Sequence, residues 1–155
     1  MSLNDSKKYT FDRVERMSIP AEADRELEVA DRAFELARDV GLSKNEANEV
    51  RLAVIEAVIN AIEHGHSDQS RIHVSFSTGS SPARLAVTVG DSGGGFDPSL
   101  VAAPNIAEKI GTKQRKRGWG LKLMRSLMDE VIVDSSPMGT RVTLIKQAKV
   151  LPPLG

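Results

Sequence analysis

Apolar residues recur at helical spacing in three parts of the chain, and each part predicts a helix. Over residues 20–41 they form one stripe with charged residues elsewhere. A second helix is expected over residues 43–65, because Ser43 followed three positions later by Glu46 is a capping box. A third helix is predicted over residues 121–130, with leucines and methionines facing inward.

Alternating apolar and polar residues predict strands in the remaining segments. Residues 72–76 and 85–89 indicate a hairpin through the turn TGSSPA, and residues 131–133 and 140–145 indicate a second hairpin. Residues 9–19 predict one weak strand. Since these strands pair as hairpins and alternate with helices, we expect an α/β two-layer sandwich with a mixed, mostly antiparallel sheet and its helices on one face.

Composition narrows the classes of function. The 155 residues, 40% of them hydrophobic, predict a single domain over residues 1–155, with a core at about 9–147 and flexible termini. The 21 basic and 21 acidic side chains cancel, so no global field favours nucleic acid or anionic membranes. The absence of cysteine excludes disulfides and thiolate chemistry, and no apolar run reaches roughly 18 residues. We therefore expect a cytoplasmic protein.

The segment LAVIEAVINAI, residues 52–62, is apolar except for Glu56 and Asn60, which share one helical face. A helix that is apolar nearly all round is expected to be buried. Burying a carboxylate costs several kcal/mol, and leaving an amide unsatisfied costs roughly 1 to 3 kcal/mol. The two side chains could simply satisfy groups in the core. Their shared face, with His64 one turn on, favours a site where Glu56 accepts a hydroxyl proton and Asn60 binds Mg²⁺.

Two glycine-rich stretches are further candidates. In DSGGG, residues 91–95, the glycines would let the backbone approach a flat ligand, and Asp91 would accept a hydrogen bond from an exocyclic amine. The alternative is an ordinary turn after a strand. In KQRKRGWGLKL, residues 113–123, basic residues precede Gly118 and Gly120 at an expected helix start, which favours phosphate binding. The alternative there is a solvated basic loop.

Other site types find little support in the sequence. The P-loop pattern is absent, and the dinucleotide fingerprint fails because Leu123 occupies the place of its third glycine. His64, His66 and His73 are accompanied only by Glu63 at ligand spacing, which does not predict a metal cluster.

The order of these motifs resembles the Bergerat ATP-binding fold of the GHKL superfamily. The motifs are Glu56-x-x-x-Asn60, Asp91-x-Gly93-x-Gly95, Gly118-x-Gly120 and Gly139-Thr140. Within that superfamily the segments EAVINAIEHGH, GWGLKLMRSLMDEV and VDSSPMGT are similar to the anti-sigma-factor serine kinases of the RsbW and SpoIIAB type. The resemblance extends from about Pro20 to Ile145.

The resemblance implies a role for each matching residue. Asn60 would hold Mg²⁺, and Glu56 would orient or deprotonate the attacking hydroxyl. Asp91 would accept from the adenine amino group, Gly95 would allow the ring to approach, and Thr140 would contact adenine through water. The remaining implied nucleotide contacts are Glu63, His64, Gly93, Gly118, Trp119, Gly120 and Leu121.

The lid departs from the pattern that the resemblance implies. An arginine expected two positions before the first glycine would contact the γ-phosphate, and Lys116 occupies that position. Arg115 and Arg117 flank it and are the candidate catalytic cations, since lysine lacks the planar two-pronged contact of arginine.

The implied function is that of a bacterial serine/threonine-protein kinase that uses ATP and Mg²⁺. It would bind an alternative sigma factor, phosphorylate a STAS-type anti-anti-sigma protein and act as a homodimer, with no nucleic acid or membrane partner. The Lys116 departure motivates an alternative, a catalytically inactive binding module whose partner surface is shaped by ATP. A third possibility, an isolated histidine-kinase catalytic domain, is disfavoured because no dimerisation helix with a phosphoacceptor histidine precedes the ATP-binding helix.

Overall fold

One antiparallel sheet forms the lower layer of the molecule. The computed structural model describes residues 9–64, 71–91, 113–136 and 139–149. In these ranges the strand order is β1-β2-β3-β5-β4, and every described pairing is antiparallel. The strands are β1 (Arg13–Pro20), β2 (Arg71–Ser80), β3 (Ala83–Asp91), β4 (Glu130–Ser136) and β5 (Gly139–Gln147).

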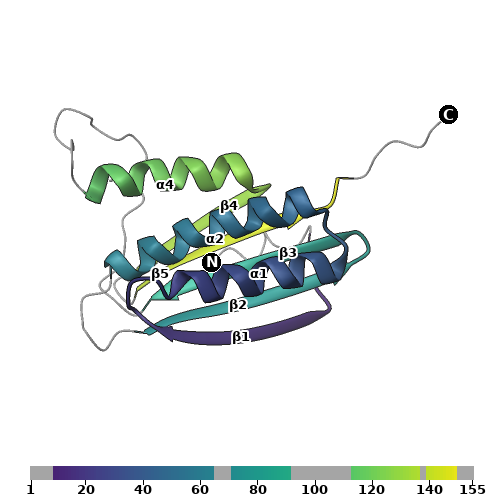
Figure 1. Ribbon diagram of the computed structural model, residues 1–155, viewed down its shortest axis with the longest axis horizontal. Coiled ribbons are helices and arrows are strands. Elements are labelled where there is room, and N and C mark those ends of the chain that lie inside the picture. Colours follow the sequence, from purple (N-terminus) through teal and green to yellow (C-terminus); the bar gives the residue numbers. More distant parts are fainter. Residues whose placement is uncertain (1–8, 65–70, 92–112, 137–138, 150–155) are drawn as a thin grey trace.

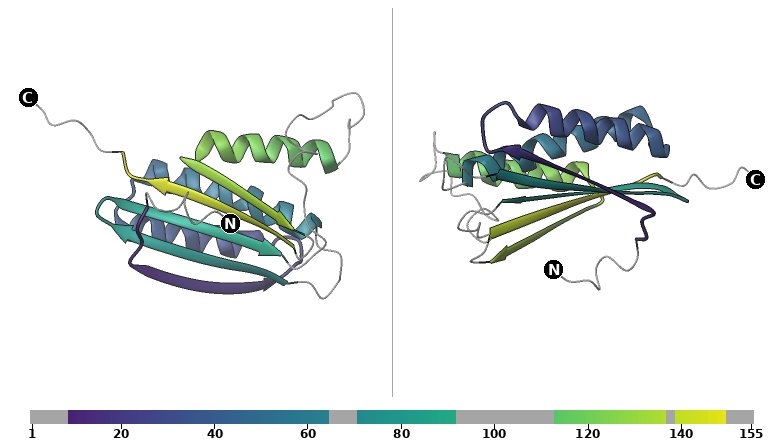
Figure 2. Two further views of the ribbon diagram at one scale, coloured as in Figure 1. Left: turned by 180° about the vertical axis from the view of Figure 1, so that it is seen from behind. Right: turned by 90° about the horizontal axis from the view of Figure 1, so that it is seen from below.

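The described helices, α1 (Glu26–Val40), α2 (Lys44–His64) and α4 (Lys113–Leu127), cover one face of this sheet (Figure 1; Figure 2, right). The other face carries no described helix. The predicted two-layer α/β sandwich is therefore confirmed, and the mostly antiparallel sheet is antiparallel throughout its described part. None of the helices in the described part of the chain has the length and apolarity needed to span a membrane.

The central position of α2 explains its unusual sequence. This helix lies between α1 and α4 and above the sheet, so three of its sides meet other elements (Figure 1). Val54 and Val58 are fully buried, and only the outward side is open, where Leu52 is 49% exposed. Burial of α2 is thus confirmed on all but its outer face.

The predicted helix boundaries are confirmed around residue 42. Gly41 ends α1 with a φ of 109°, a left-handed conformation that costs glycine little. The capping box starts α2, because Ser43 N donates to Glu46 Oε1 at 2.9 Å and Glu46 N donates to Ser43 Oγ at 3.0 Å.

The predicted start of the first helix was wrong by several residues. Pro20 belongs to β1, where it pairs with Arg71. An edge strand tolerates proline because the missing N–H is not needed for the ladder. The chain then turns through Asp24, whose φ is 75°, and α1 begins at Glu26.

The predicted start and end of the last helix were also wrong. α4 begins at Lys113, eight residues before the expected Leu121, because the lysines, arginines and glutamine of this stretch are good helix formers. Gly118 and Gly120 consequently lie inside a helix and not in front of one. The helix ends at Leu127, since Glu130 is already the first residue of β4.

Candidate functional site

Glu56 and Asn60 lie on the side of α2 that faces α4. Asn60 is 6% exposed, and Glu56, one turn earlier, is half-buried. A Cβ built on Gly120 would lie 2.8 Å from Glu56 Oε2 and 3.7 Å from Asn60 Oδ1. The backbone of α4 therefore passes directly over both polar side chains, and a larger residue at Gly120 would require the Glu56 carboxylate to shift.

The sheet contributes Asp91 and Thr140 to the same region. Asp91 is the last residue of β3, and Thr140 is the second residue of β5. They lie side by side because the adjacent residues, Gly90 and Arg141, pair with each other across the two strands. Thr140 is 6% exposed, and its Oγ1 lies 3.3 Å from Ser135 Oγ at hydrogen-bond distance. Two strand ends thus present a carboxylate and a hydroxyl toward the helices.

These side chains meet around one narrow space between α2, α4 and the ends of β3 and β5. The space is about 10 Å³, room for roughly one water molecule. It is lined by Ala57, Asn60, Ala61, Val89, Asp91, Leu121, Met124, Thr140 and Val142. The lining is apolar except for three polar side chains, and in this composition alone it resembles the lining of small-molecule sites. The space between the described residues is too small for a purine ring.

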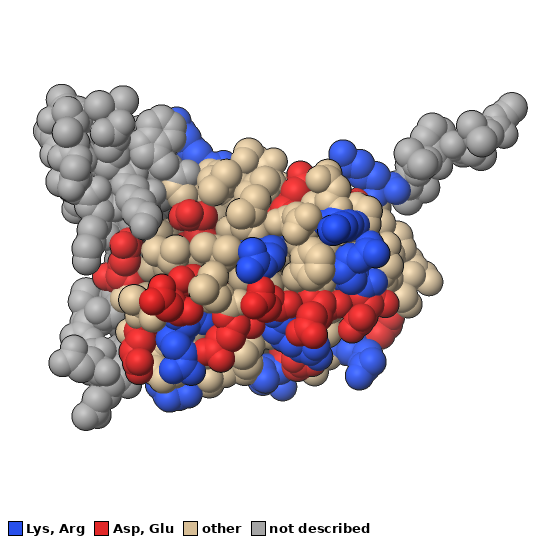
Figure 3. All heavy atoms as spheres, viewed as in Figure 1, with Lys and Arg blue, Asp and Glu red and all other residues tan. Residues whose placement is uncertain are grey.

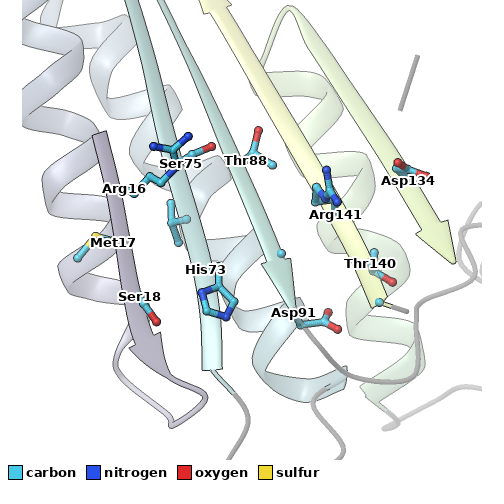
Figure 4. Close-up of a pocket in the computed structure, with 13 residues that line it drawn as sticks. Arg16, Met17, Ser18, His73, Ser75, Thr88, Asp91, Asp134, Thr140 and Arg141 are labelled. Atoms are coloured by element: carbon cyan, nitrogen blue, oxygen red, sulfur yellow. The ribbon is translucent and has the colours of Figure 1, made fainter. Parts of the chain in front are cut away.

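A larger hollow lies on the opposite, open face of the sheet. It holds about 710 Å³, and lining side chains such as those of His73 and Arg141 stand in front of the strands with the helices behind (Figure 4). Asp91 and Thr140 line both spaces, whereas Asn60 lines only the narrow one. We therefore assign the candidate site to the narrow space, where the candidate metal ligand is present.

The structure brings together Glu56, Asn60, Leu121, Thr140 and Asp91 of the predicted site. Glu63 is half-buried in the last turn of α2 and does not line the space. Gly93 and Gly95 lie outside the described residues. His64 lies in α2, and Arg115, Arg117, Gly118 and Trp119 lie in α4, but their side chains are outside the described part of the structure.

Several lining residues were missed as site residues in the sequence. Ala57 and Ala61 flank Asn60 on α2 and leave room beside it, while Val89 and Val142 form the sheet side of the space. The signal for the two alanines was their place beside Asn60, three residues before it and one residue after it. Met124 was expected to face the core, and it is fully buried while also lining the site.

Comparison with known proteins finds a matching family and relatives with kinase and anti-sigma factor names. Residues 19–146 match the family described as histidine kinase-like ATPase domain. A protein of Bacillus velezensis named serine-protein kinase RsbW is 32% identical over 133 residues, which are 84% of this chain and 82% of that protein. A protein of Bacillus subtilis named anti-sigma F factor is 34% identical over 104 residues, 66% of this chain and 70% of that protein.

Two solved structures share the fold. The RsbU and RsbW domains of a Mycobacterium tuberculosis protein superpose with a TM-score of 0.59 at 17% identity, over 91% of this chain and 35% of that chain. The histidine kinase domain of a blue-light activated histidine kinase from Erythrobacter litoralis gives a TM-score of 0.51 at 21% identity, over 78% of this chain and 60% of that chain.

Proposed function

Because this chain belongs to the histidine kinase-like ATPase domain family, we propose that the narrow space between α2, α4 and the ends of β3 and β5 binds ATP with Mg²⁺. The observation that carries the proposal is the meeting of Asn60, Asp91, Leu121 and Thr140 around one space, since they come from four different elements. We further propose that the protein is a serine kinase, because its relatives include proteins named serine-protein kinase.

The polar side chains of the space suit the parts of ATP. In the proposal, the Asp91 carboxylate accepts a hydrogen bond from the adenine amino group, and Thr140 beside it bonds to the ring through water. The Asn60 side-chain oxygen is a hard ligand, and Mg²⁺ sites on nucleotides use one or two protein oxygens together with phosphate oxygens. The bound Mg²⁺ supplies positive charge that neutralises the phosphates.

Glu56 is the proposed general base. Its carboxylate lies one helical turn from Asn60, close to where the metal and γ-phosphate are placed by the proposal. It takes the proton of the substrate serine hydroxyl, the serine oxygen bonds to the γ-phosphorus, and the bond from that phosphorus to the bridging oxygen of ADP breaks. Arg115 and Arg117 add charge to stabilise the phosphoryl group in transfer.

The names of the relatives suggest the protein partners. Since relatives include proteins named anti-sigma F factor, we propose that this protein binds an alternative sigma factor and phosphorylates a STAS-type anti-anti-sigma protein. Phosphorylation adds about −1.5 to −2 charge to that partner and weakens its hold on the kinase. A homodimer is part of the proposal, and light scattering of the purified protein tests it.

Phosphoryl transfer can be tested directly. The protein is incubated with radiolabelled ATP, Mg²⁺ and each purified STAS protein of the source organism. We expect label on a serine of one of them, with loss of at least about a hundredfold in rate for Glu56→Ala, as for removal of a general base. Leu52→Ala, an exposed neighbour on α2, is the control and keeps the rate. ATP binding without any transfer would favour the inactive binding module that Lys116 suggests.

A further inference from the structure

Lys146 is a buried cation in a position that the proposed chemistry does not use. It lies near the end of β5, is 5% exposed, and projects to the same side of the sheet as Thr140. Its Nζ lies 2.9 Å from Glu49 Oε1 of α2 and donates at 2.6 Å to the backbone oxygen of Leu127. A buried ammonium is costly unless it is paired, so both contacts are needed to keep it there.

Leu127 is the last residue of α4, so Lys146 binds the carbonyl end of that helix. The carbonyl end of a helix carries partial negative charge, which a cation stabilises. The corner that follows is also tied to β5, because Asp129 N donates to Ile145 O at 2.9 Å and Gln147 N donates to Asp129 Oδ2 at 2.7 Å. The C-terminal end of α4 is therefore fixed to β5 and, through Glu49, to α2.

The candidate site meets α4 at residues 120, 121 and 124, between the middle of the helix and its fixed C-terminal end. Gly120 lies over Glu56, and Leu121 and Met124 line the space that must widen to admit a purine. α4 packs mainly on α2 and has little contact with the sheet (Figure 1). With its C-terminal end fixed, a shift of α4 relative to α2 would pivot near Leu127, and it would displace Gly120 and Leu121 more than that end.

We propose that Lys146 is a positioning residue for nucleotide binding: by holding the C-terminal end of α4 against Glu49 and β5, it sets where Gly120 and Leu121 meet the nucleotide. The inference rests on the proposed ATP site, and Lys146 is not among the described residues that line the narrow space.

Arg84 provides a matched control. It is a second buried cation, also 5% exposed, on the adjacent strand β3, where its neighbour Leu85 pairs with Lys146. Its guanidinium donates to the backbone oxygens of Pro82 and Thr10 and to Thr10 Oγ1. It lies at the same end of the sheet as Lys146, but its hydrogen bonds within the described residues go to Thr10 and Pro82 and none to α4, so it serves to separate loss of stability from loss of α4 position.

The test uses the full chain and two readouts. Trp119 is the only tryptophan of the sequence and lies in α4, so acrylamide quenching of its emission reports on that helix. Calorimetry gives the affinity for ATP with Mg²⁺. For Lys146→Met we expect altered quenching and an affinity at least about fivefold weaker, the lower range of coupling between sites. For Arg84→Met we expect a lower melting temperature with unchanged quenching and affinity.

The outcomes separate the inference from the proposed site. Unchanged quenching and affinity in Lys146→Met, or an equal loss of affinity in Arg84→Met, would overturn the role of Lys146. If Lys146→Met does not fold, the same two measurements are made on Glu49→Gln. Because Glu49 is one-third exposed, its replacement should change quenching and affinity in the same direction but by less. If the wild type does not bind ATP, the proposed function fails, while the quenching comparison still shows whether Lys146 holds α4.

Discussion

Gly120 shows how one residue can couple two helices. Glycine inside a helix costs about 1 kcal/mol relative to alanine, so its presence in α4 needs a reason. A Cβ at this position would lie 2.8 Å from Glu56 Oε2, so glycine allows Glu56 to keep its position beneath α4. Helix stability is given up so that α4 can lie against the carboxylate of α2.

Gly120→Ala should therefore weaken ATP binding more than it weakens the fold. The added methyl group displaces Glu56 or lifts α4, at a cost of about 1 to 3 kcal/mol for overpacking, which the helix propensity of alanine partly offsets. We expect a small change in urea unfolding and a large loss of ATP affinity by calorimetry.

A double variant locates the cause of that loss. Glu56→Ala removes the carboxylate that the methyl group meets, so the unfolding cost of Gly120→Ala should disappear in the Glu56→Ala background. An equal cost in both backgrounds would show that the close approach to Glu56 is not what requires glycine at residue 120.

Single residues were predictable where they broke a local pattern. Asn60 was recognised because a polar residue in an apolar helix needs a partner, and it lines the candidate site. Gly120 was expected to open a helix, whereas it lies within one. Its constraint comes from Glu56, 64 positions earlier in the chain, and no local rule contains a contact of that kind.

At the scale of elements, the start of α2 also holds the end of the chain. Besides its capping bond to Ser43, Glu46 accepts a hydrogen bond from Lys149 N through Oε2 at 3.2 Å. Ala148 N donates to Ala83 O at 2.8 Å in the same region. The segment after β5 is therefore tied to α2 and β3.

Ser43→Ala should lower the free energy of unfolding by about 1 kcal/mol, as loss of an N-cap usually does. Glu46→Ala should lower the free energy of unfolding further, because it removes the hydrogen bonds from Ser43 N and from Lys149 N together. Urea denaturation measures both. Equal costs for the two variants would show that the contact with Lys149 contributes nothing.

The edge strand β1 is joined to α1 by an ion pair. Arg32 donates to both carboxylate oxygens of Glu15, at 2.6 and 2.7 Å. The hydrogen bonds from Arg32 hold the pKa of Glu15 below its ordinary value, against a smaller opposing effect of burial. A lowered pKa means that this stabilisation is present above the ordinary pKa of glutamate and is lost as the pH falls through the folded-state value.

Arg32→Gln should accordingly destabilise the protein at pH 7 by roughly 0.5 kcal/mol, since the pair is partly exposed and solvent screens it. The difference in free energy of unfolding between the wild type and Arg32→Gln should shrink as the pH falls below about 4, the ordinary pKa range of glutamate. Urea unfolding from pH 7 to pH 3 measures it. A difference that does not depend on pH would mean that Arg32 acts through packing alone.

Elements were predictable where their signals are local. The capping box, Gly41 and both hairpins follow from neighbouring residues, and the structure has them. The start of α4 was missed because the glycine pair suggests a helix start, while the basic residues before it favour helix equally well. Only the packing of α4 on α2 decides between these two possibilities.

For the whole molecule, the fold separates two faces with different properties. Over the helices, acidic side chains form a band with basic ones beside it, and Arg51 joins Asp31 across α1 and α2 at 2.9 Å (Figure 3). The other face is the open sheet with its hollow (Figure 4). Asp91 and Thr140 stand at the sheet end between these faces, so the candidate site is bounded by both layers.

Titration calorimetry with ATP, with GTP and with ATP lacking Mg²⁺ shows whether this boundary between the two layers is an ATP site. We predict a dissociation constant for ATP of about 1 μM. GTP should bind at least about tenfold more weakly, because Asp91 would face a carbonyl group in place of an amino group. In Asn60→Ala the affinity for ATP should no longer depend on Mg²⁺. The proposed ATP site would be wrong if ATP does not bind. It would also be wrong if ATP and GTP bind equally and Asn60→Ala keeps the Mg²⁺ dependence.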